Sequence, residues 1–114
     1  NLYMHGPEIF NFTIEMVPPL IKETLKKNNE TIETVDYFIF HQANQFMLDY
    51  LRKKLKIKED KFYNNITNFG NTVSCTIPIA IKESIDKGTL KPGDKILIAG
   101  FGVGYSWGAT IIKL

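Results

Sequence analysis

The C-terminal end of the chain constrains its fold most strongly. Residues 95–101 and 105–113 form two apolar runs that are each typical of a strand, and only the link Gly102-Val103-Gly104 separates them. Two strands joined by so short a link must be neighbours that pair antiparallel. The glycines of the link do not indicate a nucleotide-binding loop, because such a loop opens a helix and here a second strand follows.

Helices and strands alternate through the rest of the chain. A helix is predicted over 9–27, with a kink or a restart at Pro18-Pro19, because an interior proline removes a backbone hydrogen-bond donor. A buried strand is predicted over 35–40, and Asn44 is placed to cap a helix that runs to about Leu55. This alternation predicts an α/β fold with a mixed sheet and packed helices.

Three further segments complete the predicted layout. A short strand is expected over 2–4, and a loop over 65–72 leads into a helix that runs to about Lys87. Gly88 should close that helix, and Pro92-Gly93 should form a turn before the last two strands. The apolar positions expected to face the core are Ile9, Phe12, Met16, Leu20, Ile21 and Leu25 in the first helix, Met47, Leu48, Leu51 and Leu55 in the second, and Val73, Ile77, Ile81 and Ile85 in the third.

The composition fits a single domain over residues 1–114, because 44% hydrophobic and 23% charged residues can form both a core and a solvated surface. A net charge of +2 gives no argument for nucleic acid as a partner, and no apolar stretch reaches the roughly 20 residues of a membrane-spanning helix. The single cysteine suits a reducing compartment, so the cytoplasm is the expected location. The chain does not begin with Met, which is compatible with a trimmed protein or a piece of a longer one.

Two polar motifs are candidates for a catalytic site, although each also has a structural interpretation. His41-Gln42-Ala43-Asn44 lies where a strand meets a helix, and such strand ends often contact ligands in α/β sheets. A lone His is more often structural than catalytic, and Asn68-Phe69-Gly70-Asn71-Thr72 could be only a turn with an N-cap. The functional alternative is that His41 and Asn71 donate to one oxygen and stabilise an oxyanion or enolate.

Two other features also allow more than one interpretation. Cys75 lies near the start of a predicted helix, where a thiol can be activated, but its place ahead of an apolar stripe favours a small packing residue. A basic cluster is typical of a solvated helix face, and a surface for an acidic partner protein is the alternative. The cluster consists of Arg52, Lys53, Lys54, Lys56 and Lys58.

Three separated motifs together resemble one family. The segments His41-Gln42-Ala43-Asn44, Asn68-Phe69-Gly70-Asn71-Thr72 and Gly100-Phe101-Gly102-Val103-Gly104-Tyr105-Ser106-Trp107-Gly108 are similar, in order and spacing, to the C-terminal part of β-ketoacyl-[acyl carrier protein] synthase III. The resemblance covers nearly the whole chain. It implies most of the C-terminal half of a thiolase-like fold, with the nucleophile-bearing N-terminal half absent from these residues.

The resemblance also implies a site. In that family a Cys of the first half takes the acyl group from acyl-CoA, and a His and an Asn of the second half bind the thioester carbonyl of malonyl-carrier protein. The same pair stabilises the enolate left by decarboxylation. Carried over by motif, these catalytic residues are His41 and Asn71. Phe101, Ala43 and Gly102 are expected in the substrate pocket, where the apolar face of the Phe favours loss of the carboxylate.

Function and partners follow from the same resemblance. The expected reaction is decarboxylative Claisen condensation of an acyl thioester with malonyl-carrier protein in fatty-acid biosynthesis, and the chain alone is expected to be inactive without the nucleophile. A non-catalytic or secondary-metabolism relative with another acyl donor or carrier is the alternative. Acyl-CoA and acyl carrier protein are the expected substrates and partners, with no metal, no other cofactor and a homodimer for the full-length enzyme. The expected carrier-docking residues are Gln42, Lys53 and Lys54, although Asn11 and Phe46 stand where other members have a Lys and an Arg.

Overall fold

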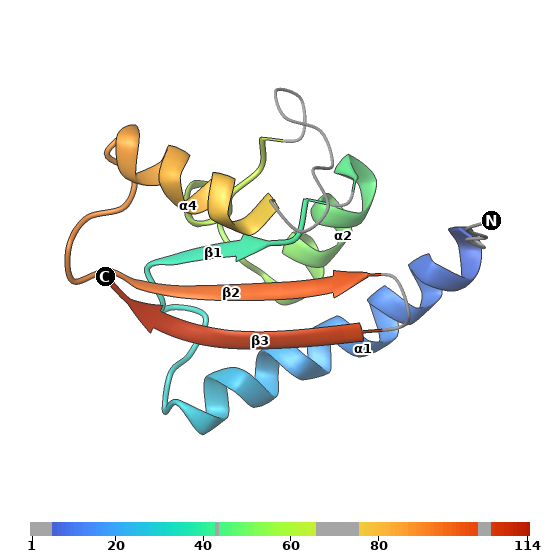
Figure 1. Ribbon diagram of the computed structural model, residues 1–114. Coiled ribbons are helices and arrows are strands. Elements are labelled where there is room, and N and C mark those ends of the chain that lie inside the picture. Colours follow the sequence, from blue (N-terminus) through green and yellow to red (C-terminus); the bar gives the residue numbers. More distant parts are fainter. Residues whose placement is uncertain (1–5, 43, 66–75, 103–105) are drawn as a thin grey trace.

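The computed structural model describes residues 6–42, 44–65, 76–102 and 106–114. Its three strands form one mixed sheet in the order β1-β2-β3, with helices on both faces (Figure 1). The expected strand over 2–4 and Cys75 lie outside the described residues. The elements are α1 (Gly6–Lys27), β1 (Tyr37–Phe40), α2 (Gln45–Leu55), the short 3-10 helix η1 (Glu59–Lys61), α4 (Thr76–Asp86), β2 (Lys95–Gly102) and β3 (Ser106–Lys113).

The sheet contains both kinds of strand pairing. β1 runs parallel to β2, from the pair Tyr37 and Ile96 to the pair Phe40 and Ala99. β2 pairs antiparallel with β3 along its whole length, so the antiparallel pair predicted from the short glycine-rich link is confirmed. Among the described strands β3 therefore lies at one edge of the sheet, beside only one neighbour.

Side chains of β1 enter two different apolar cores, because successive residues of a strand point to opposite faces. Phe38 and Phe40 belong to the core that α1 and α2 cover, whereas Tyr37 and Ile39 belong to the core beneath α4. All four residues of β1 are buried, as expected for a strand covered on both sides. In Figure 1 α1 lies along one side of the sheet and α4 along the other.

Helix α1 differs from the prediction in two ways. It is a single helix of 22 residues that continues through Pro18-Pro19, so of the predicted kink or restart the restart is wrong. Its buried side lies one residue further along than the predicted stripe, because Thr13 and Val17 are buried while Met16 and Leu20 are only half-buried. The later positions Ile21 and Leu25 are buried as predicted.

Helix α2 agrees closely with its prediction. The Asn44 side chain accepts a hydrogen bond of 2.8 Å from the backbone N–H of Met47, which is the predicted N-cap. The four predicted core positions, Met47, Leu48, Leu51 and Leu55, are all buried. The position of this cap matters because it fixes where the chain turns from β1 into α2.

Helix α4 corrects the stripe predicted for it. Ile85 is 47% exposed, whereas Ala80 and Ser84 are buried. A strict four-residue spacing drifts by about 40° at each step around a helix of 3.6 residues per turn, so the last member of the predicted stripe leaves the buried side. Pro78 lies in the first turn, where its missing N–H costs little, as predicted.

Two glycines allow the chain to leave α4 and enter β2. Gly88 has φ +76° and Gly93 has φ +93°, a region that disfavours residues with a Cβ atom. Gly88 ends the helix and Gly93 lies in the turn before β2, which confirms both sequence predictions. None of the described helices is both long and apolar enough to cross a bilayer.

Gly88→Ala should lower the free energy of unfolding by about 1 kcal/mol, because the added Cβ forces an unfavourable left-handed backbone. A Cβ at Gly88 has no heavy atom within 4 Å, so crowding adds nothing. Gly108→Ala is the matched control, since that position is equally open and has no positive φ. Urea unfolding of both variants tests this, and an equal loss in the two would show that backbone conformation is not the cause.

Candidate active site

The parallel pairing of β1 and β2 brings His41 and Phe101 together at one edge of the sheet. The backbone N–H of His41 donates to the carbonyl of Ala99 at 2.9 Å, which extends the strand pairing one residue past β1. The His41 and Phe101 rings then lie 5.6 Å apart at 88°, an edge-to-face contact. His41 thus lies at the predicted junction of strand and helix, and its ring contacts Phe101, which the resemblance places in the substrate pocket.

Phe101 is held from several sides. It is 8% exposed, pairs with Trp107 of β3 and contacts Phe40 at 6.5 Å between ring centroids. Phe40 in turn packs against Phe62 at 5.2 Å. These aromatic contacts give His41 a rigid apolar wall on one side.

Gln42 fixes the backbone around His41. Its side-chain nitrogen donates to the carbonyl of Phe40 at 2.8 Å, so this hydrogen bond spans His41. Its side-chain oxygen accepts from the backbone N–H of Asn65 at 3.2 Å. At 3% exposure Gln42 does not fit the carrier-docking role expected for it, because a buried, internally bonded side chain cannot meet a partner surface.

The remaining predicted site residues are placed less completely. Asn71 and Ala43 lie outside the described residues, so the predicted convergence of His41 and Asn71 stays a prediction. Gly102 is the last residue of β2, paired with Ser106. Lys53 and Lys54 are exposed in the last turn of α2. No cluster of His, Cys, Asp or Glu suited to a metal ion occurs among the residues that the structure describes.

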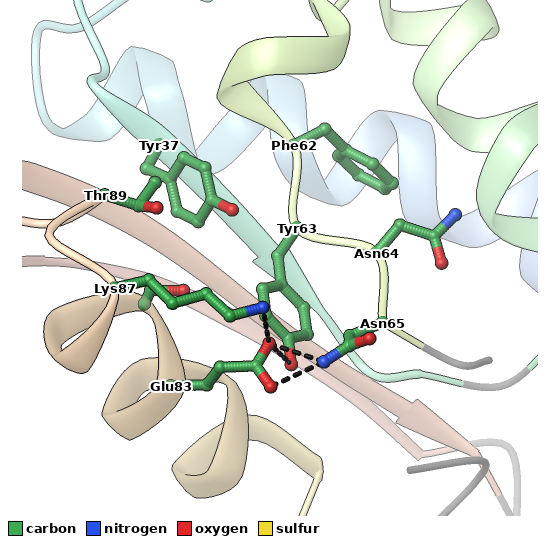
Figure 2. A pocket seen from close by; sticks show the side chains of 9 residues that line it. Tyr37, Phe62, Tyr63, Asn64, Asn65, Glu83, Lys87 and Thr89 are labelled. Carbon is green, nitrogen blue, oxygen red and sulfur yellow. Dashed lines mark hydrogen bonds and ion pairs between the residues drawn. The ribbon is translucent and has the colours of Figure 1, made fainter. Parts of the chain in front are cut away.

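Sequence reasoning missed a polar cluster behind this site. Glu83 of α4 accepts hydrogen bonds from Tyr63 and Asn65, and these residues line a cavity of about 200 Å³ (Figure 2). No sequence signal indicated this cluster, because Glu83 adjoins the side of α4 that holds the buried Ala80 and Ser84, which is not the predicted stripe. A charged residue beside the buried side of a helix calls for polar partners.

Comparison with known proteins identifies the family. Residues 25–114 match the family described as 3-oxoacyl-[acyl-carrier-protein (ACP)] synthase III C terminal. The chain belongs to this family. The match spans β1, α2, α4, β2 and β3, and therefore every described residue of the candidate site.

Individual synthase III proteins align along nearly the whole chain. A β-ketoacyl-[acyl-carrier-protein] synthase III of Clostridium perfringens is 49% identical over 111 residues, covering 97% of this chain and 34% of that protein. A crystal structure of a 3-oxoacyl-(acyl-carrier-protein) synthase III is 44% identical with a TM-score of 0.96, covering 100% of this chain and 34% of the other. The synthase III structure from Thermus thermophilus is 33% identical with a TM-score of 0.95, covering 100% and 36%.

These likenesses confirm the predicted α/β, thiolase-like fold. The chain spans about a third of the length of these relatives. His41 and Phe101 at the sheet edge both lie within the part of the chain that matches this family.

The environment of His41 in this synthase III domain determines its charge. Burial lowers the pKa of the His41 imidazole below the ordinary value, because a charged ring loses hydration in the partly apolar site. At neutral pH the ring is therefore neutral. A neutral imidazole offers one N–H donor and can stabilise charge that develops on an oxygen without bringing a full positive charge.

The lowered pKa of His41 predicts a pH dependence of stability. The unfolded state binds a proton at the ordinary pKa of about 6.5, whereas the folded state resists protonation until a lower pH. The free energy of unfolding should therefore fall as the pH drops through this window, and His41→Asn should remove that part of the loss. Imidazole NMR titration measures the pKa of His41, and urea unfolding between pH 7 and pH 5 measures the free energy of unfolding of the chain and of His41→Asn. A midpoint for His41 at or above the ordinary value would contradict this.

Proposed function

We propose that this chain supplies the carbonyl-binding part of an acyltransferase that condenses an acyl thioester with malonyl-carrier protein in fatty-acid biosynthesis. The observation that carries the proposal is the half-buried His41 ring in edge-to-face contact with Phe101 at the sheet edge, and the lowered pKa of His41 supports it. Membership of the synthase III family supports the same reaction. The alternative, a non-catalytic or secondary-metabolism relative, has less support because relatives with the synthase III name align over nearly all of the chain.

The proposed chemistry uses His41 during decarboxylation. As carbon dioxide leaves the malonyl thioester, the electron pair of the broken carbon–carbon bond moves toward the thioester oxygen and forms an enolate. An N–H of His41, together with Asn71, donates to this oxygen. The apolar face of Phe101 disfavours the charged carboxylate relative to the departing neutral molecule. The enolate carbon then attacks the acyl group held as a thioester on the cysteine that the family carries in its first half. The thiolate of that cysteine is the leaving group.

A chimera tests this function. We expect activity to survive when this chain replaces the matching third of the Clostridium perfringens relative, which is 49% identical to it. In that chimera His41→Ala should lower kcat for condensation at least about 100-fold, because a preorganised donor to the enolate oxygen is lost.

Lys82→Ala is the control for this measurement, since Lys82 is exposed on α4 and pairs with the exposed Asp86. A folded chimera that condenses equally well with and without His41 would refute the proposed role. The chain by itself should show no condensation, and turnover by the chain alone would overturn the assignment of the nucleophile to another part of the enzyme.

We further propose that the exposed side of α2 meets an acidic carrier protein. Lys53 and Lys54 are exposed near the end of α2, and Phe46, 70% exposed, lies near its start. Phe46 packs against Phe10 of α1, with ring centroids 5.5 Å apart. Phe46 thus makes an aromatic contact at the position where other members of the family have an Arg, on the helix that also carries Lys53 and Lys54. The homodimer expected from the resemblance and the cytoplasmic location expected from the single cysteine stay predictions.

The combined substitution Lys53→Glu and Lys54→Glu should lower kcat/KM for malonyl-carrier protein about 10-fold more than for malonyl-pantetheine, because the pantetheine substrate lacks the acidic protein surface that these charges attract. The difference should shrink as salt screens the surface charges. Steady-state kinetics of the chimera at low and high salt measure this. An equal effect on both substrates, or none that depends on salt, would argue against docking at this side of α2.

A further inference from the structure

Glu83 is a carboxylate with several donors around it and little contact with water. Its side chain is 16% exposed on α4. Tyr63 Oη donates to it at 2.9 Å, and Asn65 Nδ2 lies 2.6 and 2.5 Å from its two oxygens. Lys87 Nζ lies 3.6 Å away on the solvent side. Figure 2 shows the Tyr63, Asn65 and Lys87 side chains directed at this one carboxylate.

Asn65 links the Glu83 carboxylate to the turn that contains His41. Its side chain binds Glu83, while its backbone N–H donates to the side-chain oxygen of Gln42 at 3.2 Å. Gln42 Nε2 in turn donates a hydrogen bond of 2.8 Å to the carbonyl of Phe40, on the other side of His41 in the chain. A continuous series of hydrogen bonds therefore runs from α4 to the residues on either side of the imidazole.

The segment that carries Asn65 also follows the outer edge of β1. The backbone N–H of Tyr63 donates to the carbonyl of Phe38 at 3.0 Å, and the Tyr63 carbonyl accepts from Gln42 Nε2 at 3.5 Å. Loss of hydration in this site, followed by the hydrogen bond to Glu83, raises the pKa of Tyr63 to about 12. Tyr63 therefore keeps its proton and remains a donor to Glu83 at neutral pH.

Packing alone does not fix Asn65. The residues around Glu83 line a cavity of about 200 Å³ rather than a filled core. Open space adjoins the amide of Asn65, and two short contacts to Glu83 hold it from the side of α4. Removal of the carboxylate would remove both contacts and would weaken the support of Gln42.

We infer that Glu83 is a positioning residue for His41, acting through Asn65 and Gln42 although it lies on a different element from the imidazole. The effect of Glu83 on catalysis rests on the proposed function of His41. A positioning residue changes the geometry of the bound transition state, so its loss lowers kcat more than it raises KM. A residue that only stabilised α4 would instead change the unfolding midpoint and leave kcat of the folded enzyme unchanged.

The test measures kcat and KM of the chimera described above after Glu83→Ala, Glu83→Gln and the control Asp86→Asn. Asp86 lies on the same helix and pairs with the exposed Lys82 at 3.2 Å, so the control changes a charge at the surface. We expect Glu83→Ala to lower kcat ~10-fold with less than about a twofold change in KM. Glu83→Gln should recover most of that loss, because its amide oxygen still accepts a hydrogen bond.

A double-variant cycle tests the route through Gln42. If Glu83 acts through that side chain, Gln42→Ala combined with Glu83→Ala should lower kcat no further than the more damaging single change. Independent multiplication of the two effects would overturn the proposal, as would an unchanged kcat in Glu83→Ala or an equal loss in Asp86→Asn.

NMR of this chain separates failure of the inference from failure of the proposed function. The His41 imidazole signals should shift in Glu83→Ala and stay within their original widths in Asp86→Asn. If the unsubstituted chimera does not condense, the proposed function fails, and this comparison alone then decides the positioning role. Unchanged His41 signals in Glu83→Ala would overturn it.

Discussion

The candidate site depends on the parallel pairing of β1 with β2. Because both strands end at the same edge of the sheet, residues that follow one strand are placed beside residues near the end of the other. The hydrogen bond from His41 to Ala99 continues this pairing by one residue, and the His41 ring meets Phe101 as a result. A shift of the register by one residue would turn Phe101 to the opposite face and separate the two rings.

Backbone pairing alone leaves the turn after β1 without support, and buried polar groups supply it. Gln42 holds the carbonyl of Phe40 and the backbone of Asn65, and Glu83 holds the side chain of Asn65. Such groups lose water on burial, so each must be bonded inside the protein. The site therefore combines an aromatic wall, which excludes water, with a polar network that fixes direction.

Local patterns in the sequence predicted much of this arrangement. The cap at Asn44, the antiparallel last strands and the Gly88 helix end depend on neighbouring residues, so the sequence alone could indicate them. The Gln42 and Glu83 contacts join residues far apart in the chain, and no local pattern specifies which partner a buried side chain finds. The buried side of α1 differs from its predicted stripe for a related reason, because the surface that a helix packs against selects which residues are buried. The stripe predicted for α4 failed instead through its strict four-residue spacing. For Asn71 the described residues give no test.

The position of β3 at the sheet edge has a consequence beyond the site. A strand with one free side presents unpaired N–H and C=O groups, which can template the addition of another strand. β3 has this exposure over Ser106–Lys113 in the described structure, and Trp107 adds a side chain that is 45% exposed. The strand that pairs with Phe101 on one side therefore has, within the described structure, the backbone geometry of an edge strand on the other, which is the geometry that templates the addition of a further strand.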